Sequence, residues 1–155
     1  MKIFILVDQL HSHGGIEKLV ALKANYWAER FSYSITLIST EQNCRPTVYP
    51  ISDQVNKIDL GINYYRDLSF FHPKNIIKLF RNARKLLALL RREKPEFILV
   101  ASHIPMTYVL PFLSGGAKTI KEFHYSKYNI STSFKERLFT RVEALYDYLV
   151  VLSHE

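Results

Sequence analysis

The chain has 155 residues, of which 48% are hydrophobic and 23% are charged, a composition typical of one soluble globular domain rather than of a disordered chain. Its formal charge of +7 indicates a polyanionic partner, which could be a nucleic acid, a phosphorylated ligand or an anionic lipid surface. The single cysteine, Cys44, excludes an intramolecular disulfide and a thiolate metal cluster, as expected in the cytoplasm. No stretch approaches the ~20 apolar residues of a membrane span, and the apolar N-terminal run is too short for a signal peptide.

Strands and helices are expected to alternate from the N-terminus onwards. Ile3–Val7 is a continuous apolar run, which is typical of a strand buried on both faces of a parallel sheet. After a polar loop that ends in Gly14 and Gly15, apolar residues recur at helical spacing as far as about Phe31. The next expected strands are Ser34–Ser39 and Val55–Leu60, with a loop from Glu41 to Pro50 between them.

The second half of the chain continues the alternation. Pro73 is placed to start the longest expected helix, Lys74–Lys94, and Pro95 ends it. We expect a doubly wound, mostly parallel sheet with helices on both faces, which is a Rossmann-like α/β fold. The remaining expected elements are a strand at Phe97–Ala101, a short helix at Pro105–Leu113, a strand at Thr119–Phe123, a helix at Ser133–Tyr146 and a buried strand at Tyr148–Leu152.

Histidines follow the expected strands. In an open parallel sheet, ligands bind beyond the carboxyl ends of the strands, at the switch point of the strand order. His11 and His13 follow the first strand, and later strands are followed by His103, His124 and His154. In a 3-2-1-4-5-6 order, the loops after the first and fourth strands flank the crevice, and the loop after the fifth lies one strand further.

The loop and helix after the first strand allow more than one interpretation. Gly14 and Gly15 could bring backbone N–H groups to an anion, or Gly14 could cap the helix while Glu17 caps it in return. The pattern is neither a dinucleotide fingerprint nor a P-loop. His11 and His13 lack a third ligand, so a hydrogen-bonded loop pair is favoured over a metal site.

His103 and His124 could each be a structural histidine, but their shared location at strand ends favours a functional role. Ser102 stands beside His103, which is compatible with a hydrolase. The GxSxG motif is absent, however, and no acid is placed to complete a triad, so we exclude that class.

The longest expected helix carries much of the basic charge. Its apolar side is expected to face the sheet and comprises Ile76, Ile77, Phe80, Ala83, Leu87 and Leu90. The basic side is either a solvated outer face or a docking surface for anionic lipid. Nucleic acid is not expected, because no helix-turn-helix, RRM or KH signature is present. The membrane-facing candidates are Lys74, Lys78, Arg81, Lys85 and Arg92.

Four motifs follow one another along the chain. Lys2–Ile5 followed by Gly14–Glu17 comes first, and Phe97–His103, Thr119–His124 and Tyr148–Ser153 come later. In order and spacing the set resembles the N-terminal, acceptor-side domain of family-4 (group 1) retaining glycosyltransferases of the GT-B fold. The resemblance covers nearly the whole chain.

This resemblance implies sugar transfer with retention from a nucleotide-diphosphate sugar to a glycan or lipid-linked acceptor, in cell-surface polysaccharide or lipopolysaccharide biosynthesis. It implies that Gly14 and Gly15 approach the donor diphosphate and that His124 is the catalytic residue near the transferred sugar. No cofactor or metal is expected, because the nucleotide sugar is a substrate. The residues expected to line the crevice on the acceptor side are His11, His13, Glu17 and His103.

The family's second domain, which holds the nucleotide site, is absent from residues 1–155. Because the chain stops at Ser153–Glu155, where another helix would begin, we expect a single domain of a truncated protein that is inactive alone. The expected location is the cytoplasm, with a peripheral position at the inner face of the membrane. Two alternatives stay open: a stand-alone flavodoxin-like ligand-binding module, and a membrane-surface interaction module without catalysis.

Overall fold

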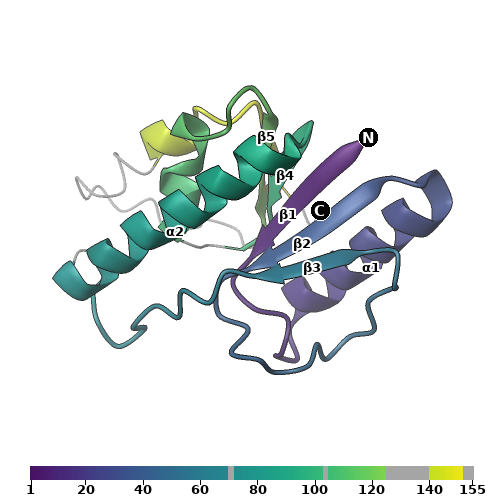
Figure 1. The fold of residues 1–155 in the computed structure, drawn as a ribbon, viewed down its shortest axis with the longest axis horizontal. Helices are drawn as coiled ribbons and strands as arrows, with labels where there is room; N and C mark the ends of the chain where they lie inside the picture. Colours follow the sequence, from purple (N-terminus) through teal and green to yellow (C-terminus); the bar gives the residue numbers. More distant parts are fainter. Residues whose placement is uncertain (70–71, 103–104, 125–139, 152–155) are drawn as a thin grey trace.

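The computed structural model describes residues 1–69, 72–102, 105–124 and 140–151. The described strands form one parallel sheet in the order β3-β2-β1-β4-β5-β6 (Figure 1). The strands are β1 (Lys2–Val7), β2 (Ser34–Ser39), β3 (Asn56–Asp59), β4 (Phe97–Val100), β5 (Lys118–Phe123) and β6 (Tyr148–Val151). The helices are α1 (Gly15–Phe31) and α2 (Pro73–Glu93), with the 3-10 turns η1 (Pro105–Tyr108) and η2 (Leu110–Phe112).

The strand order confirms the expected doubly wound fold. From β1 the chain moves outward through β2 to β3, and α2 then carries it back to β4 on the other side of β1. Ile3 of β1 accordingly pairs with Ile35 of β2 on one side and with Phe97 of β4 on the other. The switch point therefore lies between β1 and β4, at their carboxyl ends.

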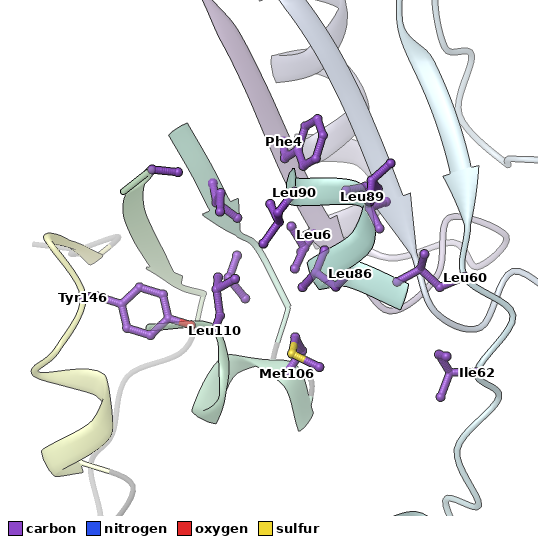
Figure 2. Packing of buried hydrophobic residues seen from close by; sticks show 14 residues of the cluster. Phe4, Leu6, Leu60, Ile62, Leu86, Leu89, Leu90, Met106, Leu110 and Tyr146 are labelled. Atoms are coloured by element: carbon purple, nitrogen blue, oxygen red, sulfur yellow. The ribbon is translucent and has the colours of Figure 1, made fainter. Parts of the chain in front are cut away.

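Alternating side chains of β1 build two separate cores. Phe4 and Leu6 pack on the α2 side of the sheet, where Figure 2 shows them beside Leu86, Leu89 and Leu90 of α2. Residues of the other parity, Ile3, Ile5 and Val7, pack on the α1 side. Because both faces are covered, the whole strand is apolar, as the sequence predicts for a central parallel strand.

Capping residues mark the start of α2 and the ends of both helices. The Nδ1 atom of His72 caps α2 by accepting a hydrogen bond from the backbone N of Lys74 at 3.3 Å, and Pro73 follows as the first helical residue. Ser32 and Lys94 cap the two helix ends in the left-handed conformation, with φ of 52° and 46°. Pro73 therefore starts the helix as expected.

The structure corrects two expected elements. Pro105–Leu113 does not form one short helix but the two 3-10 turns η1 and η2. Tyr148–Val151 is a strand, but it is exposed rather than buried, because among the described strands β6 is last in the order and pairs with β5 alone. Of the helix expected at Ser133–Tyr146, residues 133–139 lie outside the described part, and residues 140–143 are helical.

The apolar face expected for α2 is wrong in part. Ile77 and Phe80 are exposed, whereas the helix buries a stripe that contains Asn75 and Asn82 together with leucines further along. Both asparagines are compatible with burial because they form hydrogen bonds: Asn82 donates to the hydroxyl of Tyr64 at 3.0 Å. Asn75 both accepts from and donates to the backbone of the preceding loop. The helix is thus rotated about its axis relative to the expectation.

Candidate functional site

Polar side chains join the carboxyl ends of β1, β2 and β4. Asp8, directly after β1, accepts a hydrogen bond from the hydroxyl of Ser102, which follows β4, at 3.0 Å. Its other carboxylate oxygen accepts from Arg66 at 3.0 Å, and Arg66 also donates to Glu41, after β2, at 2.8 Å. These hydrogen bonds therefore hold together the loops on both sides of the switch point.

The charges of this cluster stabilise one another. Partial burial works against the charged form of Arg66, but hydrogen bonds and attraction from Glu41 and Asp8 outweigh it and raise the pKa of Arg66. The Arg66 side chain remains 58% exposed, so the gain in stability from this pairing is small. The main consequence of the pairing is that it holds the loop before α2 over the strand ends.

A buried lysine extends the cluster to β5. Lys121 is 2% exposed, and its Nζ donates to the backbone carbonyl of Ser102 at 2.9 Å. Ser102 therefore contacts Asp8 through its hydroxyl and Lys121 through its carbonyl. A buried ammonium group needs such partners, because the loss of hydration is costly. The strand end that carries Ser102 is thus held from both neighbouring strands.

The N-terminus of α1 lies at the same edge of the sheet. Gly14 is the N-cap in an extended conformation, and the Glu17 carboxylate lies against it, in the space that a side chain at position 14 would occupy. A Cβ at Gly15 would instead meet nothing within 4 Å, and Gly15 is exposed. The fold itself therefore does not require a glycine at position 15. A missing side chain there leaves room for a ligand to approach the backbone.

His124 follows β5 and is connected to α1 through Glu122. One carboxylate oxygen of Glu122 pairs with Lys23 of α1, and the other lies 3.4 Å from Nε2 of His124. The side chains of Glu122 and His124 are only 8% and 9% exposed. Oε2 of Glu122 and Nε2 of His124 form no hydrogen bond to any described residue. Two buried polar atoms are thus placed at the strand end where a ligand would bind.

The pKa of His124 is lowered from its ordinary value. Burial is the largest cause, because it disfavours the imidazolium, and the nearby positive charges of Lys23 and Lys121 act in the same direction. The Glu122 carboxylate opposes them and raises the pKa of His124, without reversing the shift. At neutral pH the imidazole is therefore uncharged, and it can both donate and accept a hydrogen bond.

The other predicted histidines are placed differently. His11 is half-buried, and its Nδ1 has no hydrogen bond to a described residue. His13 is exposed and meets the ring of Tyr49 edge-on, with ring centroids 6.4 Å apart. The part of the chain that the structure describes contains no hydrogen bond between His11 and His13 and no group of three potential metal ligands. His103 and His154 lie outside the described residues.

The basic residues of α2 differ in the contacts that their side chains make. Lys78 and Lys85 turn towards the loop after β3, where they donate to the carbonyls of Asn63 and Leu60. Lys74 lies over the ring of Tyr65, and Arg92 pairs with Glu93. Arg81, another of the five predicted membrane-facing residues, is exposed, and within the described ranges its side chain makes no hydrogen bond or ion pair. Among the described residues, no helix has the length and hydrophobicity to cross a membrane.

The site also contains residues that the sequence did not identify. Asp8, Arg66, Lys23, Glu122 and Lys121 were not expected to contribute. A signal was present for the last two, because adjacent charged residues in a strand that lies inside the sheet indicate a buried polar network. The others had no local signal, since their partners are distant in the sequence.

Solved structures share this fold at low sequence identity. UDP-GlcNAc 2-epimerase from Methanocaldococcus jannaschii aligns with 99% of this chain and 40% of its own, at a TM-score of 0.59 and 13% identity. A glycosyltransferase from Rickettsia africae ESF-5 aligns with 88% of this chain and 32% of its own, at a TM-score of 0.55 and 15% identity. The lipopolysaccharide outer core galactosyltransferase WaaB, in its apo form, aligns with 96% and 38%, at a TM-score of 0.54 and 7% identity.

These likenesses show the fold, a Rossmann-like parallel α/β sheet of the kind found in GT-B proteins. Two of the three proteins are glycosyltransferases, and the third is an epimerase of a nucleotide sugar. The chain spans 32% to 40% of their lengths. No family model matches the sequence, and no curated protein does.

Proposed function

We propose that this chain is the acceptor-side domain of a retaining glycosyltransferase of the family-4 type. The parent protein transfers a sugar from a nucleotide-diphosphate sugar to a glycan or lipid-linked acceptor, in the synthesis of cell-surface polysaccharide or lipopolysaccharide. One observation carries the proposal. In a fold that glycosyltransferases use, the Lys23–Glu122 pair connects α1, whose glycine-rich N-terminus is open, to the strand end that bears His124.

In this proposal the N-terminus of α1 receives the donor diphosphate. Backbone N–H groups at a helix start are free to bind an anion, and the helix dipole favours negative charge there. The open space at Gly15 supports a close approach, with Gly14 beside it. As the sugar leaves, negative charge develops on the diphosphate, and preorganised N–H groups stabilise that charge.

His124 contacts the transferred sugar. Its lowered pKa keeps the imidazole neutral, so it forms hydrogen bonds to sugar hydroxyls without adding a positive charge. The Lys23–Glu122 pair supports the ring from the α1 side of the sheet. His124 is therefore the catalytic residue of the proposal, and Glu122 is a positioning residue.

The remaining assignments follow the same proposal. His11, His13, Glu17 and His103 face the acceptor, and the nucleotide binds through a second domain outside these residues. The reaction uses no metal and no cofactor beyond the donor substrate. The protein works in the cytoplasm, at the inner face of the membrane, where lipid-linked acceptors are available.

The test is sugar transfer by the parent protein that contains this chain. The protein is incubated with UDP- and GDP-sugars and extracted lipid or glycan acceptors, and the anomeric configuration of the product is determined by NMR. We expect one nucleotide sugar to be consumed with retention, in the presence of a metal chelator. Epimerisation of the nucleotide sugar without transfer would refute the proposal, as would transfer with inversion.

A further inference from the structure

The outward side of α2 holds two large apolar side chains in solvent. Ile77 and Phe80 are 69% and 72% exposed, the highest values among the large hydrophobic residues that the structure describes. They are three positions apart in the helix, so they lie on the same face. Neighbouring Ile76 is also exposed, at 36%. An apolar ridge of this kind is costly in water unless a partner covers it.

Arginines border this apolar ridge. The side chains of Arg81 and Arg84 are exposed and follow Phe80 on the outward side of the helix. Across its full length, α2 contains seven basic residues and one acidic residue, Glu93, in the last turn. The outward side therefore combines bulky apolar groups with charge of one sign.

The lysines of α2 make contacts that the exposed arginines do not make. Lys78 and Lys85 bind backbone carbonyls of the loop after β3, which turns their charges towards the sheet edge. Arg81 and Arg84 are exposed on the outward side, and each guanidinium presents several donors to phosphate oxygens. The outward face is thus bordered by arginines, and one of them, Arg81, is also among the membrane-facing residues that the sequence predicts.

We infer that Ile77, Phe80, Arg81 and Arg84 form a docking face for an anionic lipid bilayer. The two apolar side chains insert at the boundary of the acyl chains, while the arginines remain at the level of the lipid phosphates. A folded protein partner would require a complementary area of about 800 Å² on each side and commonly a mixture of charges. A narrow apolar ridge with uniformly positive neighbours matches a fluid anionic surface instead.

The inference deepens the proposed membrane location, and in one respect it rests on the proposed function. The first turns of α2 extend beyond the carboxyl ends of the central strands (Figure 1), so docking would bring the candidate site close to the bilayer. A lipid-linked acceptor would then reach the site without leaving the membrane. Docking itself is measured without turnover, so its failure and the failure of the transfer reaction are distinguishable.

The experiment is flotation of the 155-residue chain with vesicles of phosphatidylcholine and phosphatidylglycerol, compared with vesicles of phosphatidylcholine alone, at low salt. We expect flotation with the anionic vesicles only. Ile77→Ser with Phe80→Ser should lower the partition coefficient by about tenfold or more. Arg81→Gln and Arg84→Gln should each lower it about fivefold.

Matched controls separate a local face from general charge and hydrophobicity. Leu22→Ser changes an apolar residue of α1 that is 58% exposed, and Lys18→Gln with Arg30→Gln removes two exposed charges from the same helix. These variants should float like the wild type. The inference is overturned if they lose as much binding as the α2 variants, or if the wild type does not float with anionic vesicles.

A fluorescent probe tests insertion without removing binding residues other than Phe80. In a Cys44→Ser background, an environment-sensitive dye is attached to Phe80→Cys or, as the control, to Leu22→Cys. We expect a blue shift at position 80 with anionic vesicles and none at position 22. No shift at position 80 would overturn insertion, whatever the flotation result.

Discussion

The Glu122 carboxylate lies 3.4 Å from Nε2 of His124 and is paired through its other oxygen with Lys23 of α1. A single acidic side chain thus mediates between a helix and the histidine that ends β5. The arrangement predicts how the charge of His124 responds to each partner.

Replacement of Lys23 or Glu122 should shift the pKa of His124 in opposite directions. Lys23→Met removes a positive charge that lowers the pKa of His124, so this pKa should rise. Glu122→Gln removes the negative charge that raises it, so the pKa should fall further. Histidine ring signals in an NMR titration of the 155-residue chain provide the measurement. Equal titration curves in all three proteins would contradict the arrangement.

The lowered pKa of His124 also predicts a pH dependence of stability. In the unfolded chain the imidazole of His124 takes up a proton near pH 6.5, the ordinary pKa of histidine. In the folded chain it does so only at lower pH. The contribution of His124 is therefore fully present above pH 6.5 and is lost as pH falls through the folded pKa. Urea unfolding of the wild type and of His124→Asn measures the free energy of unfolding as the pH is lowered from above 6.5. The variant should lose less of this free energy than the wild type.

If the parent protein is the proposed glycosyltransferase, Gly15 and His124 should matter for turnover and not for folding. Gly15→Val places a side chain where we propose that the diphosphate approaches the backbone, and loss of one such donor typically lowers the rate by ~10²–10³. A Cβ at this position meets nothing within 4 Å, so the variant should fold normally. His124→Ala should lower kcat/KM unless the backbone carbonyl makes the contact. Wild-type kcat/KM in both folded variants would contradict the proposed site.

The 155-residue chain alone should transfer no sugar, because we propose that the nucleotide binds to a second domain. The purified chain is tested with the donor and acceptor that the parent protein uses. Circular dichroism shows in parallel that the preparation is folded. Measurable transfer by the chain would mean that residues 1–155 contain a complete donor site.

Asp147 should stabilise the connection between β5 and β6 in a pH-dependent way. Hydrogen bonds from Lys118 and from the backbone and hydroxyl of Thr119 lower the pKa of Asp147 from 3.8 to about 2. Its contribution is present above pH 3.8 and is lost as pH falls through about 2. Because the group is partly solvated, Asp147→Asn should cost no more than about 1 kcal/mol at neutral pH. Chemical denaturation at neutral and acidic pH measures the difference, which should disappear in acid.

A pair of alanine substitutions tests which face of α2 is buried. Leu86 is fully buried against β1 and β4, so Leu86→Ala should lower the free energy of unfolding by about 2–5 kcal/mol. Phe80→Ala removes a larger side chain that is mostly in solvent, and stability should change by about 0.5 kcal/mol or less. A larger loss of stability in Phe80→Ala than in Leu86→Ala would mean that α2 buries the face that the sequence pattern suggested.

The sequence by itself determined the order of the elements and the sheet that they form. Apolar runs such as Ile3–Val7, and breaks at Pro73 and Pro95, are local signals, and local signals suffice to place strands and helices along the chain. The 3-2-1-4-5-6 order was taken from Rossmann-like sheets in general, and the structure has that order. The polar strand ends could be named for the same reason.

Only the tertiary structure decided which faces are buried and which side chains meet. The orientation of α2 depended on Asn75 and Asn82, whose hydrogen bonds in the folded chain make burial possible. Lys23 and Glu122 are separated by 99 positions, and Asp8 and Ser102 by 94. No local pattern connects residues that far apart. They meet because β1, β4 and β5 lie side by side in the sheet, with α1 packed across one face, and that arrangement exists only in the folded chain.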